Sequence, residues 1–215
     1  MSQNKGYFIT FEGIEGCGKT TQVALAGKYL GACGIPHLLT AEPGGTVLGE
    51  QIRRLILHET KVRMAPESEL LLFSAARAQH VEEIIRPSLE SGSWVLCDRF
   101  SDATIAYQGY GRGLDLDLIC RLNRFSSRAL VPDLTILFDT PVQTGLQRAR
   151  SKTANLTGCL QGDRIEGEDL HFHQRVRDGY LRLAEQEPAR LRIVDGTKDI
   201  EAIHSEVCTC LDALR

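Results

Sequence analysis

One stretch near the N-terminus constrains the fold more than any other part of the chain. Residues 13–20 read GIEGCGKT, a complete match to the pattern G-x-x-x-x-G-K-[ST]. Glycines at these positions let the backbone turn so tightly that successive N–H groups point at one anion. Lys19 can reach the β- and γ-phosphates of a nucleotide, and the hydroxyl of Thr20 can hold Mg²⁺. The spacing therefore predicts a phosphate-binding loop.

The segments on either side of this loop favour the same interpretation over an ordinary Gly-rich turn. Residues 7–11 form a short apolar run typical of a buried strand, and residues 20–30 have helical spacing. A helix that begins directly after the loop presents its N–H groups and the positive end of its dipole to the phosphates. The residues expected to bind the nucleotide are Gly13, Ile14, Glu15, Gly16, Cys17, Gly18, Lys19, Thr20 and Thr21.

Composition excludes several classes of protein. A chain of 215 residues suits one large α/β domain or two small ones. The net charge of −3 argues against a nucleic-acid-coating protein, because such proteins usually carry a basic surface. No apolar run approaches the roughly 20 residues of a membrane helix. The N-terminus also lacks the apolar core of a signal peptide. We therefore expect a soluble protein with no membrane or nucleic-acid partner.

The cysteines bear on the cellular compartment. Seven of them, an odd number, occur without C-x-x-C spacing, and several fall on apolar segments. This favours reduced core thiols in a cytoplasmic protein over a disulfide framework. The pairs His171/His173 and Cys208/Cys210 make a poor zinc site, because residues two apart on a helix point to different faces.

Hydrophobic patterning predicts four further strands, at 36–41, 94–98, 134–139 and 191–195. Helices are expected at 46–58, 66–89, 104–108, 114–127, 141–150, 168–186 and 200–214, with a Gly-rich bend at 109–113 and a mobile excursion at 151–167. Pro87 should bend or loosen the last turn of its helix. Five strands alternating with helices predict a doubly wound, five-stranded parallel α/β sheet flanked by helices in one domain, 1–215. Ligands should bind outside the carboxyl ends of the strands.

Charged residues gather at that edge of the predicted sheet. Glu15, Glu42, Asp98, Arg99 and Asp139 all follow the end of a predicted strand. A carboxylate in such a position can instead cap the next helix, and for Asp139 this alternative carries equal weight. Arg99 differs, because an arginine beside a phosphate site has an anion to bind.

Several motifs together resemble the bacterial thymidylate kinases, which are nucleoside-monophosphate kinases of the P-loop class. They are the phosphate loop, AEPGGT at 41–46, LLFSAARAQH at 71–80 and DRFSDATIAYQGYGR at 98–112. The resemblance spans nearly the whole chain in order, and the motifs outside the loop are not shared by P-loop proteins at large. It implies transfer of a phosphoryl group from ATP·Mg²⁺ to dTMP, giving dTDP and ADP, by a homodimer that pairs through helices away from the active cleft.

The resemblance also implies roles for individual residues. Lys19 and Thr20 would serve ATP and Mg²⁺, and Arg99 would bridge the two reacting phosphates. Glu15 would contact the sugar 3′-hydroxyl and the surroundings of the metal, and Arg53 would hold the dTMP phosphate. The expected substrate-binding residues are Glu15, Glu42, Pro43, Arg53, Phe73, Arg77, Arg99, Thr104, Tyr107 and Gln108, and the expected Mg²⁺ ligands are Thr20 and Asp98.

The resemblance also implies the pyrimidine contacts, and helical spacing agrees with them. Phe73 and Arg77 match residues that stack on thymine and hydrogen-bond its O4, and positions i and i+4 share one helix face. Phe73 considered alone would be assigned to the core. Tyr107 would exclude ribonucleotides sterically near C2′; the alternative is a structural tyrosine under the bend. The family often has Ser at Ala103 and Arg at Ala41, so the pyrimidine contacts are less certain than the reaction.

The source of catalytic positive charge is a separate question. Some thymidylate kinases carry an arginine within the phosphate loop, where this chain has Gly16. Relatives with glycine there have a basic lid, including a match to DRIE at 163–166. We therefore expect a lid at about 148–167 that delivers Arg150 or Arg164 as a catalytic residue, with Arg148 on the nucleotide. The alternative is a solvated charged face.

Two other functions compete with this one. A kinase of another mononucleotide or of a deoxynucleoside is disfavoured by the RAQH and AYQG segments. A nucleotide-dependent switch that hydrolyses GTP would be expected to carry an N-K-x-D guanine-reading segment, and the chain has none.

Overall fold

The computed structural model describes residues 5–57, 63–157 and 164–215. Five parallel strands form one sheet in the order β2-β3-β1-β4-β5. The strands are β1 (Phe8–Glu12), β2 (His37–Ala41), β3 (Trp94–Asp98), β4 (Leu134–Asp139) and β5 (Leu191–Asp195). Phe11 of β1 lies opposite Asp98 of β3 and Ile136 of β4, so the ends of the three central strands meet at one edge. This confirms the predicted doubly wound parallel sheet.

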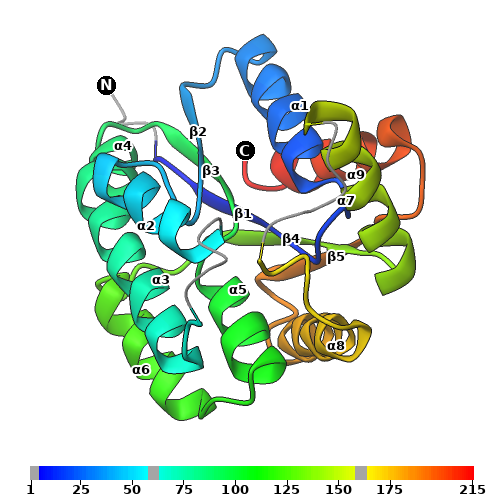
Figure 1. The fold of residues 1–215 in the computed structure, drawn as a ribbon. Helices are drawn as coiled ribbons and strands as arrows, with labels where there is room; N and C mark the ends of the chain where they lie inside the picture. The colour runs from blue at the N-terminus through cyan, green and yellow to red at the C-terminus, as the bar shows by residue number, and fades with distance from the viewer. Residues whose placement is uncertain (1–4, 58–62, 158–163) are drawn as a thin grey trace.

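Helices cover both faces of the sheet (Figure 1). On one side lie α1 (Lys19–Ala32), α7 (Val142–Thr157) and α9 (Ile200–Asp212); α3 (Pro66–His80), α6 (Leu116–Ser126) and α8 (Leu170–Gln186) lie on the other. The remaining elements are α2 (Val47–Leu57), α4 (Arg86–Glu90), α5 (Ser101–Thr104) and two π-helical segments, η1 (Val81–Ile85) and η2 (Ile105–Gly111). Central β1 is buried along its whole length, as expected of a strand covered on both faces.

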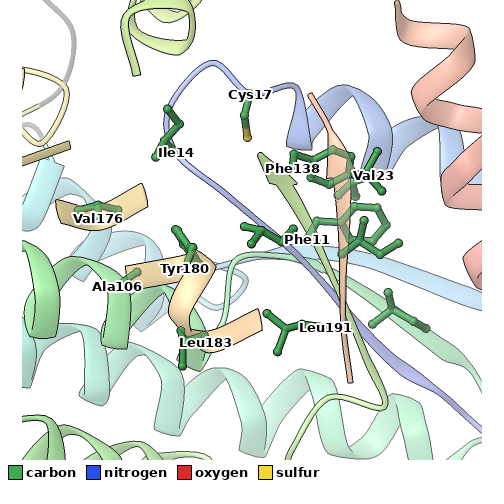
Figure 2. Close-up of a cluster of buried hydrophobic side chains, with 14 of the residues drawn as sticks. Phe11, Ile14, Cys17, Val23, Ala106, Phe138, Val176, Tyr180, Leu183 and Leu191 are labelled. Carbon is green, nitrogen blue, oxygen red and sulfur yellow. The ribbon is translucent and has the colours of Figure 1, made fainter. Parts of the chain in front are cut away.

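The hydrophobic core continues from the sheet into the phosphate loop. Phe11 stacks on Phe138 with ring centroids 6.0 Å apart. Figure 2 shows Ile14 and Cys17 of the loop in the same buried cluster, and their side chains are 2% and 1% exposed. Tyr180 of α8 packs into this cluster from the other side of β1. The loop is therefore fixed by packing at two of its positions.

Two predicted helices contain π-helical turns. The segment predicted at 66–89 is helical to Glu90, but Val81–Ile85 is wound more widely just before Pro87. Because Pro87 has no N–H and its ring crowds the preceding turn, a wider turn lets the helix continue past it. The helix predicted at 104–108 begins earlier, at Ser101, and continues as η2 to Gly111, so most of the expected bend at 109–113 is helical.

The predicted excursion at 151–167 is wrong in its first part. Residues 151–157 continue α7, in keeping with a stretch that contains no proline or glycine. Residues 158–163, which include Cys159 and Asp163, lie outside the described residues, as does His58 at the expected end of α2.

Six cysteines are described and all six are free. Cys17 and Cys97 are buried, as predicted, whereas Cys120 is exposed. No helix within the described residues is both long and apolar enough to cross a membrane.

Candidate active site

A cleft of about 1240 Å³ opens at the carboxyl ends of the strands. This exceeds the roughly 300–1,000 Å³ typical of a site for one small ligand. The phosphate loop lines one part and the residues after β2 and β3 line another. The predicted site residues that line it are Glu15, Gly16, Cys17, Gly18, Lys19, Thr20, Thr21, Glu42, Pro43, Arg53, Phe73, Arg77, Asp98, Arg99, Thr104, Tyr107, Gln108 and Arg148; Gly13, Ile14, Arg150 and Arg164 are not among its lining residues.

The lysine of the loop folds back over the loop itself. Lys19 Nζ donates to the carbonyl oxygens of Gly13 at 2.9 Å and Ile14 at 2.8 Å, and lies 3.4 Å from Cys17 Sγ. Gly18 has a φ of +100° with open space around its missing side chain, so backbone conformation alone requires glycine there. The lysine is thus held at the mouth of the loop by bonds that phosphate oxygens could replace.

Gly16 is glycine because α7 packs directly on it. A Cβ at this position would collide with the backbone oxygen of Gly145, and a Cβ on Gly145 would come within 2.5 Å of the Glu15 oxygen. The helix that carries Arg148 therefore rests on the phosphate loop through two facing glycines. No side chain at position 16 fits this contact.

Thr20 and Asp98 meet across the cleft, although they are far apart in the sequence. The Thr20 hydroxyl donates to Asp98 Oδ2 at 2.8 Å. The hydroxyl belongs to the first turn of α1 and the carboxylate to the last residue of β3. Both supply oxygen ligands of the kind that Mg²⁺ prefers. The pair fits the predicted metal site.

Arg99 stands where the two parts of the cleft join. Its backbone is left-handed, with φ of +72°, which is uncommon for a residue other than glycine. Its guanidinium Nη1 donates to Gly13 O at 2.9 Å, and Nη2 donates to Glu15 Oε1 at 3.0 Å. The guanidinium also lies 4.8 Å from the centre of the Tyr107 ring. Arg99 therefore contacts the phosphate loop and the opposite wall together.

Glu15 is held as a carboxylate. Burial alone would raise its pKa, but the adjacent His173 imidazole and the charges of Arg99 and Lys19 lower the pKa to about 2. Tyr107 also donates its hydroxyl proton to Glu15 Oε1 at 2.6 Å. An ionised carboxylate in the cleft is a hydrogen-bond acceptor, suited to a hydroxyl group of a ligand.

His173 contributes to this site without having been predicted there. It is fully buried on α8, with Nδ1 3.4 Å from Glu15 Oε2. The sequence signal is the spacing of His173, Val176 and Tyr180, which places all three on one helix face. The sequence motifs raise His173 only as a poor zinc ligand and do not name it as part of this site.

Glu12, the last residue of β1, is a second buried carboxyl group that sequence reasoning missed. Its side chain is 0% exposed. It accepts from the Phe100 N–H at 2.7 Å and from the Tyr180 hydroxyl at 2.7 Å. Burial, followed by the charge of Asp102, raises the pKa of Glu12 to about 8 against the opposing effect of Arg99. Glu12 directly follows the apolar run at 7–11, yet it is not among the charged residues predicted at this edge of the sheet.

The other part of the cleft is built around Arg77. This side chain is 1% exposed and makes four hydrogen bonds to described residues. Nε donates to Glu42 at 2.8 Å and Nη1 to Asn123 at 2.7 Å, while Nη2 donates to Phe100 O at 3.0 Å and the Thr104 hydroxyl at 2.8 Å. A guanidinium has five N–H groups, so one remains for a ligand.

The neighbours of Arg77 complete a wall for a flat ligand. Glu42 Oε1 is 3.1 Å from His80 Nδ1, and Phe73 is half-buried on the cleft side of α3. Arg53 Nη1 donates to Pro43 O at 2.9 Å, at the edge of this wall. Gln108 reaches away, because its amide donates to Glu69 at 2.7 Å.

The predicted lid arginines are separated in space. Arg148 lines the cleft and donates to Gly196 O at 2.8 Å, beside the loop between β5 and α9. Arg150 is exposed on α7. Arg164 donates to Ile56 O at 2.8 Å and pairs with Glu69, which also binds Arg112. Arg148 therefore lies at the cleft, whereas the Arg164 side chain is held away from it by Glu69 of α3.

Comparisons with known proteins agree with the resemblance that the motifs indicate. The family model described as thymidylate kinase matches residues 11–207. The chain belongs to the thymidylate kinase family. It is 53% identical to the thymidylate kinase of Syntrophus aciditrophicus over 97% of this chain and 95% of that protein. It is 50% identical to that of Geobacter sulfurreducens over 96% of each.

A solved structure supports the same family by shape. The thymidylate kinase from Ehrlichia chaffeensis has a TM-score of 0.75 to this chain at 37% identity, covering 96% of this chain and 99% of that one. The five-stranded parallel sheet flanked by helices is therefore the thymidylate kinase fold. Members of this family are nucleoside-monophosphate kinases, which confirms the enzyme class predicted from the motifs.

Proposed function

We propose that this chain transfers the γ-phosphoryl group of ATP to dTMP, giving dTDP and ADP for dTTP synthesis. The observation that supports this most strongly is the place of Arg99. It stands between a phosphate-binding loop and a second wall built for a flat, polar ligand, with bonds to Gly13 and Glu15. A cation between two nucleotide sites neutralises charge on the donor and acceptor phosphates as they approach.

ATP would occupy the side formed by the phosphate loop and the β5–α9 loop. Lys19 would exchange its two carbonyl bonds for oxygens of the β- and γ-phosphates, and the first N–H groups of α1 would face the same phosphates. Arg148 and the stretch 197–200 line the cleft beyond them. These residues would hold the rest of the nucleotide.

Mg²⁺ would be held by Thr20 and Asp98, whose oxygen atoms are already 2.8 Å apart. When bound there, the ion would neutralise charge on the β- and γ-phosphates. The role of the chain is to hold the carboxylate of Asp98 against the first turn of α1.

dTMP would lie against the wall that contains Arg77. Phe73 offers a stacking surface, and the remaining N–H of Arg77 can reach O4 of thymine. Arg53 would hold the phosphate, with Pro43 fixing its direction. Glu15, ionised because its pKa is lowered to about 2, would accept from the sugar 3′-hydroxyl. The acceptor phosphate needs no general base, since its oxygen is already a nucleophile.

The lid would supply the remaining positive charge. The contact between Gly16 and Gly145 leaves no room for an arginine inside the loop, so a further cation must come from outside it. We propose one domain, 1–215, with a lid at about 148–167 whose candidates are Arg148, Arg150 and Arg164. Arg148 is already at the cleft, whereas Arg164 would first leave Glu69.

A homodimer in the cytoplasm is the proposed state. Large apolar side chains of α3 and α6 are exposed and do not line the cleft: Leu71, Leu116, Leu118 and Phe125, the last 83% exposed. Exposed apolar side chains on two adjoining helices favour an association surface there. Light scattering should give twice the mass of the chain, and Phe125→Asp should shift it toward the monomer. A wild-type monomer at micromolar concentration would contradict the dimer.

A coupled assay on the purified chain tests the activity. ADP should form from ATP only when dTMP is present, and turnover measured across dTMP, dUMP, dCMP, AMP and thymidine should be highest with dTMP. Comparable use of another acceptor would replace dTMP as the substrate. ATP or GTP hydrolysis without any acceptor would instead support a nucleotide-dependent switch.

A further inference from the structure

The backbone at Arg99 needs an explanation that the cleft does not provide. A non-glycine residue with φ of +72° costs about 1 kcal/mol or more and persists only where its surroundings fix it. The Arg99 N–H donates to Phe11 O at 3.0 Å. The next N–H, that of Phe100, donates to the Glu12 carboxyl group at 2.7 Å. The turn that aims Arg99 is therefore closed by the last two residues of β1.

The same carboxyl group also acts on the guanidinium. Arg99 Nη1 donates to the Tyr180 hydroxyl at 3.2 Å, and this hydroxyl donates to Glu12 Oε2 at 2.7 Å. One oxygen of Glu12 thus fixes the backbone after Arg99, and the other fixes the end of its side chain through Tyr180. A residue held at both ends has little freedom left to change its direction.

Neither of these two residues is placed to touch a ligand. Glu12 is 0% and Tyr180 1% exposed, and neither lines the cleft. Tyr180 extends from α8 into the core beside Ala106, beneath the loop (Figure 2). A buried carboxyl group carries a large desolvation penalty unless it is hydrogen-bonded, and packing alone would be met by an apolar side chain. The Tyr180 hydroxyl instead bonds to Arg99 directly, and Glu12 bonds to Tyr180 and to the N–H that follows Arg99.

We propose that Glu12 and Tyr180 are positioning residues that hold Arg99 in the orientation needed for phosphoryl transfer. This rests on the proposed role of Arg99 between the two reacting phosphates. Through Tyr180 the fold gives α8, the helix that follows the lid, a direct contact with the reacting centre. The sequence motifs name Arg99 but not the pair that orients it.

The first experiment removes one hydroxyl group. Tyr180→Phe keeps the ring against Tyr107, where the centroids are 6.2 Å apart, and removes only its bonds to Glu12 and Arg99. We expect kcat to fall about ten- to a hundredfold, the effect of one hydrogen bond to a charged group. KM for ATP and dTMP should change less than about threefold, since Arg99 would act mainly in the transition state.

A matched control separates this effect from the loss of any tyrosine hydroxyl. Tyr29 donates to Asp212 at 2.8 Å, on the far side of the sheet, and Tyr29→Phe should leave kcat unchanged. Glu12→Ala is the second variant, because it removes both oxygens that hold the Phe100 N–H and the Tyr180 hydroxyl. It should lower kcat in the same direction, with thermal unfolding showing that both variants are folded.

The deciding measurement is a double-mutant cycle. If Tyr180 acts through Arg99, Tyr180→Phe should have no further effect on kcat in an Arg99→Ala background. An equal loss in both backgrounds would overturn the proposal, and so would wild-type kcat in Tyr180→Phe. Wild-type kcat in Arg99→Ala would remove Arg99 from the mechanism and this proposal with it. The wild-type dTMP assay reports separately on the proposed reaction.

Discussion

The two parts of the cleft are prepared for their ligands in different ways. On the phosphate side, Lys19 is bound to two carbonyl oxygens of its own loop. On the base side, Arg77 is buried with four hydrogen bonds to side chains and a carbonyl of other elements. The first arrangement can exchange its bonds for a ligand, whereas the second is a finished wall that a ligand meets with one free N–H.

The difference follows from the chemistry of the two side chains. A lysine ammonium is a point charge on a flexible stem, and it can move from carbonyl to phosphate oxygens at little cost. An arginine guanidinium is a rigid fork that fixes several partners at once. A phosphoryl group that changes position during a reaction suits the first, and a base that must be recognised suits the second.

The largest loss of kcat should follow removal of the lid arginine that adds positive charge to the phosphate side. Replacing one of Arg148, Arg150 and Arg164 by Ala should lower kcat by 10³ or more, the value of an arginine finger. The dTMP KM should change little, because the interaction belongs mainly to the transition state. If steady-state kinetics show all three variants within about threefold of wild type, the lid is only a cover.

Lys19→Ala should reduce turnover on the order of 10²–10⁴, because charge on the transferring phosphoryl group loses a cation. The free energy of unfolding should change by no more than about 1 kcal/mol, since water can satisfy the carbonyl oxygens that the lysine leaves. Kinetics and thermal unfolding of one preparation check both. Retention of more than about a tenth of wild-type turnover would remove Lys19 from the mechanism.

Arg77→Met, unlike Lys19→Ala, should lower the free energy of unfolding. It leaves Glu42, which is 6% exposed, without its ionic partner, and breaking a buried pair costs about 3–5 kcal/mol of stability. Urea unfolding should therefore move to a lower midpoint. Arg53→Met is the control, because Arg53 is only part-buried and bonds to one carbonyl oxygen. An Arg77 variant as stable as wild type would show that the base side is not a preformed wall.

What could be predicted from the sequence divides along the same line. The phosphate loop is contiguous, so 13–20 fixes both its shape and its chemistry, and the strands that carry the site alternate with helices in a recognisable order. Partners on the base side are separated by tens of residues, as Arg77 is from Asn123. Hydrophobic periodicity reports which face is buried, not which polar atoms will meet inside. Resemblance named Arg77 but not Asn123, and only the structure shows the bond between them.

Glu12 and Glu69 show the limit of pattern reading most clearly. Glu12 directly follows a predicted strand and Glu69 lies in a predicted helix; both are buried, and only the structure shows their partners. Arg112 and Arg164 reach Glu69 from two distant segments. Because acidic residues are usually solvated, a single sequence gives no reason to place either one inside.

The stability of the protein should depend on pH through Glu12. Its folded-state pKa of about 8 exceeds the ordinary value of 4.5, so the proton is bound more tightly when folded. The stabilisation that Glu12 gives the folded state is complete below about pH 4.5 and is lost as pH rises through 8. Relative to Glu12→Gln, the wild-type free energy of unfolding should fall by a few kcal/mol between these values. Parallel pH dependences in denaturant titrations of the two proteins would contradict the raised pKa.

The smallest expected effect concerns the choice between ribose and deoxyribose substrates. It depends on Tyr107, which lies where the phosphate side and the base side of the cleft meet. Tyr107 is 4% exposed, with its ring against Arg99 and its hydroxyl on Glu15. If the ring excludes a 2′-hydroxyl, Tyr107→Ala should raise the ratio of ribo to deoxy turnover about tenfold, an energy typical of a small steric contact. Tyr107→Phe, which keeps the ring, should leave this ratio unchanged. The ratio does not depend on how much of a destabilised variant is folded, because both substrates are used by the same enzyme sample. An unchanged ratio in Tyr107→Ala would make Tyr107 a structural residue that positions Glu15, and the selection of deoxyribose would have to lie elsewhere in the cleft.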